Sequence, residues 1–372
     1  MNKMVFANLF HRPLRSLISV VAIAVEVTLI LLVVGLCMGF IDDSAQRQKG
    51  IGFDVMVSPP GSSFLTGITG APVSMKVADK LRELPHVAAV TPIVMHMVTS
   101  GRLEVIDGID LNPSSPNDFD RIGRPFQYLA GGPFNGPDDM IIDDIMAKQS
   151  HIKVGDTMEL LSTKFRVCGI VEHGKGARRY VPIATLQNLI GSEGKASMFY
   201  VQADNSANAD LITSEIKQVP GMEQYVVRSI AEYSTLMTPA NMPGLNIFFN
   251  VVIGVSVVIG FLVIFQSMYT AVMERTREIG ILKSLGANKF YIINVVLRES
   301  FVLAVGGIVA GIGISALSRF AILNSFPVLH IVWSNGWILR TAVLAVFGAL
   351  LGALYPAFKA AQKDPIDALA YE

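Results

Sequence analysis

Few side chains in this sequence combine into a pattern that could do chemistry. The nucleotide-binding pattern GxxxxGKS/T, the zinc-protease pattern HExxH, the hydrolase pattern GxSxG and the redox pattern CxxC do not occur in its 372 residues. Glycine and lysine recur at residues 191–195, but without the spacing of a phosphate-binding loop. The histidines are scattered, at His11, His86, His96, His151, His173 and His330. We therefore predict no catalytic residue, no metal site, no cofactor and no enzymatic activity of the chain itself.

One ionisable side chain, Glu26, lies inside an apolar run at residues 17–40. At 1.5 Å per residue it stands about 14 Å along a helix, near the middle of a hydrocarbon layer about 30 Å thick. An exposed carboxylate there would cost several kcal/mol, so Glu26 is expected to face a partner helix or a cavity. It is either a polar element of a site between protomers, which could bind cargo, or a protonated carboxyl bonded to a neighbouring backbone or hydroxyl group.

A second signal is the run ERTREIGILKSLGA at residues 274–287, which mixes charged and apolar side chains. Its charges alternate in sign, its apolar residues follow helical spacing, and a glycine stands where the helix would end. The pattern predicts a short amphipathic helix along the membrane that docks on a partner; the alternative is a plain polar connector. The candidate docking residues are Glu274, Arg275, Arg277, Glu278, Ile281, Leu282, Leu285 and Gly286.

The elements that must position these residues are those of a membrane protein. Hydrophobic residues make up 51% of the chain and charged residues only 16%, against about 25% in soluble domains. The formal net charge of zero gives no indication of nucleic acid as a partner. Four apolar stretches are long enough to cross a bilayer as helices, at residues 17–40, 247–273, 300–323 and 337–358. Two of them carry the GxxxG spacing of closely packed helices, at Gly307 and Gly311 and at Gly348 and Gly352.

Lysine and arginine predict the orientation, because short segments rich in them stay in the cytoplasm. The first sixteen residues hold three and no acidic residue, residues 274–299 hold five, and residues 324–336 hold none. The only two tryptophans, Trp333 and Trp337, flank that last loop, as expected at a membrane interface. We expect a multi-pass protein of the inner (plasma) membrane with both termini and residues 274–299 in the cytoplasm.

The polar stretch between the first and second spans, residues 42–245, is expected to form an extracytoplasmic α+β domain. Two strand and helix units at its ends, about 42–125 and 195–245, are predicted to pack together around a β-rich insert at about 126–194. The predicted helices cover residues 77–84 and 208–219; the predicted strands cover 87–98, 103–109, 140–142, 157–161, 164–171, 180–182, 198–202 and 225–228.

The fold class is therefore membrane α-helical, with four transmembrane helices and an α+β domain between the first and the second. Residues 1–41 hold an amphipathic cytoplasmic start and the first spanning helix. The domain follows at residues 42–245. Residues 246–372 hold the remaining three spanning helices, the segment 274–290 and a cytoplasmic tail.

The run ERTREIGILKSLGA resembles the signature that follows the second spanning helix in MacB/FtsX-type ABC permeases, the family that includes the lipoprotein-releasing subunits LolC and LolE. The order of elements resembles the family over nearly the whole chain. The tail, with Tyr355-Pro356-Ala357, Ala360-Ala361 and the run DPIDAL at residues 364–369, is similar to the family's ending. The chain departs from MacB itself in having no fused ATPase domain, and from larger peptide-antibiotic sensors in having four spans.

The resemblance implies the permease subunit of an ABC exporter, in which a dimer of separate ATPase subunits binds the coupling segment 274–290. ATP hydrolysis would then move the outer domains and extrude an amphiphilic or extracytoplasmic substrate by mechanotransmission. The implied partners are a second permease copy, giving a homodimer, or a paralogue, with membrane lipids and a periplasmic adaptor protein as further candidates.

The alternative function is an FtsX-like signalling module whose outer domain activates a cell-wall hydrolase without transport. The coupling segment would serve both functions, so it does not separate them. Neighbouring reading frames would: an adaptor protein favours export, and a peptidoglycan hydrolase favours signalling.

Overall fold

The computed structural model describes residues 13–63, 70–99, 103–326 and 329–362. The chain divides into two compact units. The membrane unit comprises Met1–Gly39 and Pro243–Glu372, and the α/β domain comprises Phe40–Met242. The run DPIDAL at residues 364–369 lies outside the described residues, as do Lys3 and Arg12.

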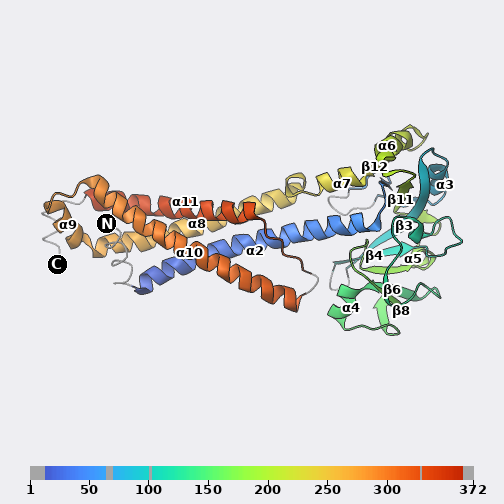
Figure 1. The fold of residues 1–372 in the computed structure, drawn as a ribbon, viewed down its shortest axis with the longest axis horizontal. Helices are drawn as coiled ribbons and strands as arrows, with labels where there is room; N and C mark the ends of the chain where they lie inside the picture. The colour runs from blue at the N-terminus through green and yellow to red at the C-terminus, as the bar shows by residue number, and fades with distance from the viewer. Residues whose placement is uncertain (1–12, 64–69, 100–102, 327–328, 363–372) are drawn as a thin grey trace. The chain divides into compact units, whose positions relative to one another are not determined.

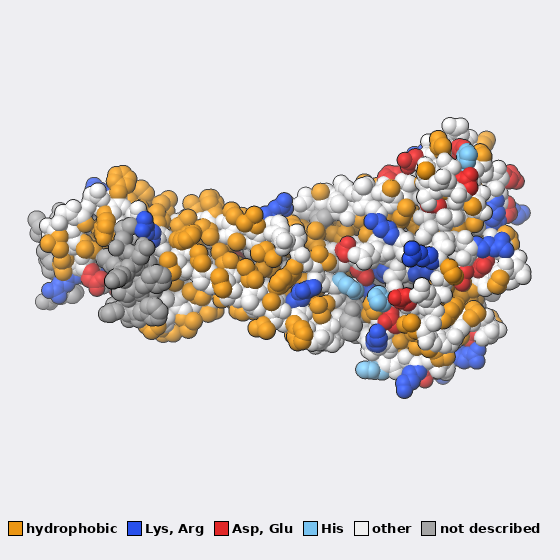
Figure 2. Space-filling view, viewed as in Figure 1, with side chains coloured by type: hydrophobic (Ala, Val, Ile, Leu, Met, Phe, Trp, Pro, Cys, Tyr) orange, Lys and Arg blue, Asp and Glu red, His pale blue; other side chains and the backbone are white. Residues whose placement is uncertain are grey.

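The membrane unit is built from long apolar helices that run side by side (Figure 1). Four helices are long and apolar enough to cross a membrane, as the sequence predicted: α2 (Pro13–Ile51), α8 (Pro243–Glu274), α10 (Lys289–Ser325) and α11 (Asn335–Gln362). The short helix α9 (Thr276–Ser284) lies between α8 and α10. On the face shown in Figure 2, hydrophobic side chains cover these helices, whereas charged side chains gather over the α/β domain.

The glycines in GxxxG spacing allow the helices to approach closely. A Cβ atom on Gly307 of α10 would lie 2.5 Å from Cβ of Ile23, and one on Gly311 would lie 2.8 Å from the carbonyl oxygen of Ala24. On α11, a Cβ on Gly352 would lie 2.7 Å from the carbonyl oxygen of Phe261. The predicted packing role is confirmed: α2 packs on the glycines of α10, and α8 packs on those of α11.

The α/β domain is organised around a ten-stranded sheet in the order β12-β1-β11-β3-β4-β9-β6-β8-β5, with β7 paired to β8 and a separate two-stranded sheet of β2 and β10. The strands are β1 (Val55–Ser58), β2 (Val73–Ser74), β3 (Val87–Thr99), β4 (Leu103–Ile109), β5 (Tyr128–Gly131), β6 (Asp139–Asp143), β7 (Thr157–Leu160), β8 (Thr163–Val171), β9 (Arg179–Pro182), β10 (Lys195–Ala196), β11 (Met198–Ala203) and β12 (Val226–Ser229). Its helices are α3 (Val77–Arg82), α4 (Asp144–Ser150), α5 (Ile183–Leu189), α6 (Ala209–Gln218) and α7 (Ile230–Leu236), with 3₁₀ turns at Phe119–Arg121, Ser206–Asn208 and Pro239–Asn241.

Every strand and helix that the sequence predicted in this domain is present, with ends shifted by two residues at most. The two ends of the domain share one core, in which Leu81 of α3 and Ile212 of α6 pack with Phe199 of β11. Strand β3 pairs with β11 through Val87–Ile93 and with β4 through Val94–Thr99. Because β3 is long enough to pair in both directions, the insert strands extend the same sheet.

Helix α2 is longer than the sequence predicted. The apolar run ends at Phe40, but the helix continues through polar residues to Ile51 and is 39 residues long. Asp43 and Arg47 form an ion pair one turn apart, and Ile51 is fully buried in the core of the α/β domain. Local charge pairing together with burial of the last turn keeps this polar segment helical.

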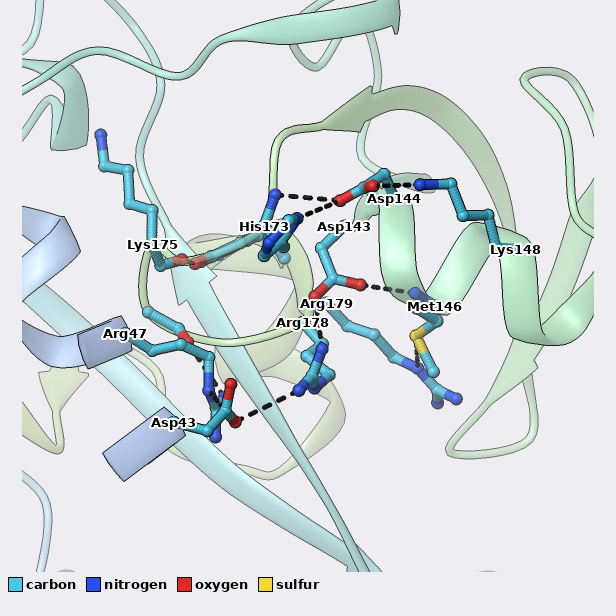
Figure 3. Close-up of polar contacts among 12 residues, drawn as sticks. Asp43, Arg47, Asp143, Asp144, Met146, Lys148, His173, Lys175, Arg178 and Arg179 are labelled. Atoms are coloured by element: carbon cyan, nitrogen blue, oxygen red, sulfur yellow. Dashed lines mark hydrogen bonds and ion pairs between the residues drawn. The ribbon is translucent and has the colours of Figure 1, made fainter. Parts of the chain in front are cut away.

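The last turns of α2 are fixed to the loop between β8 and β9, as Figure 3 shows. Arg47 donates to the carbonyl oxygen of Gly176 at 3.1 Å, and the Gly176 amide donates back to the carbonyl oxygen of Arg47 at 2.9 Å. Arg178 joins Asp43 of α2, at 3.2 Å, to Asp143 at the start of α4, at 2.9 Å. These reciprocal contacts hold the end of α2 inside the domain.

A buried carboxyl group lies near Arg47, in the last turns of α2. Asp107 of β4 is 3% exposed, and its Oδ1 atom has no hydrogen-bond partner in the described part of the chain. Burial raises the pKa of Asp107 to about 7, and the Arg47 guanidinium and the Ala177 amide oppose that rise.

Candidate coupling site in the membrane unit

Helix α9 is held against the membrane unit by one of its faces. The chain breaks between α8 and α9 at Arg275, whose φ and ψ of −105° and 17° interrupt the helical path. The Thr276 hydroxyl donates to the carbonyl oxygen of Met273 at 2.8 Å, and Ile279 belongs to the buried core of the unit. Lys283 donates to the carbonyl oxygen of Ala361 at 3.0 Å, which ties α9 to the end of α11.

The opposite face of α9 carries exposed apolar side chains. Leu285, which directly follows the helix, is 80% exposed, and Ile281 is 43% exposed. Leu282, the third apolar residue that the sequence singled out, is partly buried and packs against the unit's own core. Arg277 and Glu278 are exposed. Ile281 and Leu285 are therefore the exposed apolar residues of this segment, and the charged pair is exposed beside them.

Gly286 ends the α9 segment in the left-handed conformation, with φ of +95°. The Ala287 amide donates to the carbonyl oxygen of Leu282, and the Gly286 amide donates to that of Lys283, both at 3.0 Å. This is the Schellman arrangement, in which a glycine lets the chain reverse without a steric penalty. Asn288 then caps α10 by accepting the amide of Tyr291 at 2.7 Å.

A cluster of ion pairs lies where α2, α8, α9 and α10 meet. The Glu299 carboxylate of α10, 4% exposed, accepts from Arg275 at 3.2 Å and from Arg15 of α2 at 3.4 Å. Arg15 also pairs with Glu274, the last residue of α8, at 3.4 Å. The sequence pattern pointed to Glu274 and Arg275 but not to Glu299. The available signal was that Glu299 is the single acidic residue within residues 279–299, next to the third span.

A cavity opens beside this cluster. Its apolar wall comes from α8, α9 and α10, and its charged wall comes from Arg275, Glu278 and Glu299. The apolar lining residues are Met268, Ala271, Val272, Ile279, Leu282, Ile292, Val295 and Val296. The buried side of α9 therefore borders a cavity and is not packed along its whole length.

Glu26, the predicted intramembrane polar residue, lies between helices of the same chain. It is 5% exposed, and a Cβ atom on Gly260 of α8 would lie 1.9 Å from its Oε2 atom. Its Oε1 atom has no hydrogen-bond partner among the described residues. The Thr28 hydroxyl, a candidate partner, donates instead to the carbonyl oxygen of Gly311 at 3.1 Å. Glu26 thus faces α8, where glycine leaves room for its carboxyl group.

Two family models together match most of the chain. The MacB-like periplasmic core domain matches residues 16–219, and the FtsX-like permease C-terminal region matches residues 250–365. This chain belongs to the MacB/FtsX-type family of ABC transporter permeases. The resemblance carried by the segment at residues 274–287 is confirmed, because that segment lies inside the FtsX-like match.

Relatives of the family are similar to this chain over its full length. One is a Bacillus subtilis protein described as the uncharacterized ABC transporter permease YknZ, 25% identical over 100% of this chain and 98% of its own length. Another is the macrolide export ATP-binding/permease protein MacB of Vibrio parahaemolyticus, 23% identical over 99% of this chain and 59% of its own length. The chain therefore spans about three fifths of that MacB relative. Among solved structures, the periplasmic region of MacB from Actinobacillus actinomycetemcomitans covers 51% of this chain and 94% of its own, with 16% identity and a TM-score of 0.38. Membership of a permease family is consistent with a subunit that is not itself catalytic.

Proposed function

We propose that this chain is the transmembrane subunit of an ABC exporter whose ATP hydrolysis takes place on a separate ATPase chain. The observation that carries the proposal is α9, a short helix fixed on one face with Ile281 and Leu285 exposed on the other. Burying an exposed leucine side chain is worth about 1.5 to 3 kcal/mol. An ATPase surface that covers these two residues would gain this free energy, while Arg277 and Glu278 fix the orientation.

The charge distribution supports an inner-membrane location with α9 and both termini in the cytoplasm. Arg15, Arg275 and Lys283 lie in or beside the contacts that anchor α9. Arg319 lies 5.6 Å from the ring of Trp333, and Arg340 lies 5.1 Å from the ring of Trp337. Arginines stacked on interfacial tryptophans are typical of side chains that reach the headgroups from a helix end. The α/β domain would then be extracytoplasmic.

A second copy of the chain is the partner that we propose for the exposed faces of α2 and α8. On α8, Phe248, Val251, Val255, Val258 and Leu262 are each about half exposed and alternate at spacings of three and four residues. Such a stripe presents a continuous seam, whereas the GxxxG glycines already pack inside the chain. A paralogous permease with the same seam would fit the same surface, and lipid would cover what remains.

In this proposal, closure of the ATPase dimer on ATP displaces α9, and the helices carry the displacement to the extracytoplasmic domains. The uninterrupted helix α2, fixed at its end by Arg47 and Arg178, supplies a route for that motion. The moving domains would extrude an amphiphilic or extracytoplasmic substrate by mechanotransmission, with a periplasmic adaptor as a further partner.

The test is purification of the tagged chain from its native membranes in mild detergent. We expect an ATPase subunit to co-elute, and Leu285→Glu to lose it while the permease itself remains monodisperse. The matched control is Leu129→Glu, which places the same charge at a 60% exposed leucine of the α/β domain. ATP turnover by a single purified chain would refute the separate ATPase subunit. ATPase recovery that is as high with Leu285→Glu as with Leu129→Glu would show that α9 is only a connector. Co-elution of a peptidoglycan hydrolase would instead favour signalling.

A further inference from the structure

Glu299 is the group on which separate helices of the membrane unit converge. Its carboxylate receives the Arg275 guanidinium at 3.2 and 3.4 Å and the Arg15 guanidinium at 3.4 Å. Arg15 stands in the first turn of α2, and Arg275 is the one residue between α8 and α9. One buried carboxylate thus connects the start of the first spanning helix to the start of α9.

Fold stability alone does not explain such a cluster. A buried ion pair is often no more stabilising than apolar residues of the same volume, because removing the charges from water costs as much as their attraction returns. About one turn away from Glu299 on either side, α10 presents the apolar residues Val295, Val296 and Leu303, which are buried. A fourth apolar side chain would pack there without the cost of desolvation. The charges therefore suit a role in which position matters.

The cluster also borders open space. Arg275 and Glu299 both line the cavity beside α9, so neither residue is packed on every side. The distances of 3.2 to 3.4 Å are at the long end of hydrogen bonding, yet charge attraction persists over such lengths in a poorly hydrated site. A displacement of α9 that moves Arg275 would therefore pull on Glu299 and Arg15 together.

We propose that Glu299 is a positioning residue that transmits the displacement of α9 to α2 through Arg275 and Arg15. This inference rests on the proposed function, because α9 must first dock on an ATPase. It assigns the transmission step to a specific carboxylate. Helix α2 receives the displacement directly, and it continues as one element to Ile51.

The experiment uses the full complex of the chain with its co-purified ATPase, reconstituted in nanodiscs. Glu299→Gln keeps the shape of the side chain and removes its charge. We expect this variant to bind the ATPase within about twofold of the original chain. Its stimulation of ATP turnover should fall about 5- to 150-fold, the range typical of energetic coupling between sites. The matched control is Arg298→Gln, the exposed neighbour on the same helix, which should change neither quantity.

A double-substitution cycle separates transmission from simple loss of structure. Arg275→Gln combined with Glu299→Gln should stimulate no less than either single variant, because the two residues act through each other. Exchanging the charges, as Arg275→Glu with Glu299→Arg, should leave the stimulation low, because the arginine at position 299 would then face the Arg15 guanidinium and the link to α2 would stay broken. Should Glu299→Gln prevent folding, the neutral double variant carries the test, because it removes both charges of the Arg275–Glu299 pair while Arg15 keeps its pair with Glu274.

The outcomes that overturn the inference are distinct. Loss of ATPase binding in Glu299→Gln would mean that the cluster only shapes the docking surface. Unchanged stimulation would mean that α2 receives its motion by another route, and additive losses in the cycle would mean that Arg275 and Glu299 act independently. Failure of the proposed function looks different, since the unsubstituted chain would then bind no ATPase.

Discussion

Replacing Asp107 with Asn should remove a pH dependence from the stability of the α/β domain. Asp107 is buried on β4, opposite Tyr180 of β9, and the Arg47 guanidinium is the nearby positive charge that acts on it. In the folded domain its pKa is about 7, against 3.8 for the freely solvated group. The folded chain therefore binds this proton more tightly than the unfolded chain does.

The sign and the size follow from that difference. Below about pH 4 the carboxyl is protonated in both states, so its protonation does not penalise folding. As the pH rises from about 4 to 7, the unfolded chain ionises while the folded chain does not, and the free energy of unfolding falls. Above about pH 7 the loss is complete. At about 1.4 kcal/mol for each pH unit between the two pKa values, it amounts to about 4 kcal/mol.

Hydrogen exchange of β4 and β9 amides, measured by mass spectrometry on the whole chain between pH 5 and 8, reads this free energy locally. Asp107→Asn should be closer in stability to the original chain at pH 5 than at pH 8, where it should be the more stable of the two. The difference in the free energy of unfolding between the two chains should widen by several kcal/mol over this range. Glu159→Gln, at an exposed carboxylate of β7, is the control, and its pH profile of stability should run parallel to that of the original chain. Parallel pH profiles for Asp107→Asn and the original chain would refute the reasoning.

Four further predictions concern the membrane unit. Leu285→Ala should weaken ATPase binding by about 10- to 100-fold, as expected for the loss of about 1.5 to 3 kcal/mol of burial free energy. Leu282→Ala should mainly lower the melting temperature of the chain. If binding and melting measurements give the reverse pattern, the assignment of Leu285 to the docking surface and of Leu282 to the core is wrong. Gly286→Val should cost about 1 to 2 kcal/mol because its φ of +95° excludes β-branched residues, and should reduce ATPase stimulation more than Gly244→Val, which has open space and a helical position. Gly260→Ala should destabilise the unit by about 1 to 3 kcal/mol because the added methyl group would clash with the Glu26 carboxyl, and adding Glu26→Ala should restore the lost stability. If Glu26→Gln leaves transport and its pH dependence unchanged, the Glu26 charge has no functional role.

The sequence predicted the membrane helices and the strands from local patterns that burial enforces. Four apolar runs of spanning length correspond to four helices that are long and apolar enough to cross a membrane, because unsatisfied backbone groups in hydrocarbon leave few other conformations. Alternating apolar residues located the strands that the structure contains, including the full extent of Leu103–Ile109. The end of α9 was also readable, since Gly286 adopts the left-handed conformation expected of a glycine after a helix.

Other features depend on contacts between distant residues, which no local pattern encodes. The extension of α2 to Ile51 requires the core of the α/β domain and the loop at Gly176 and Arg178, more than 100 residues away in sequence. Leu282 packs against the core of the membrane unit, whereas Leu285 is exposed. This difference depends on how α9 packs against the other helices of the unit. Helical spacing placed both residues on one apolar side and could not separate them.

In the candidate site, the difference between what the sequence determines and what the tertiary structure decides is clearest at Glu299 and Glu26. Composition and spacing determined that a segment of mixed charge follows the second span and that one carboxyl lies deep in the first. Only the tertiary structure places Glu299 between Arg15 and Arg275, which are 284 and 24 residues away in sequence, and seats Glu26 against Gly260. The physical reason is that the energy of a buried charge depends on its neighbours in space, and helix packing chooses those neighbours.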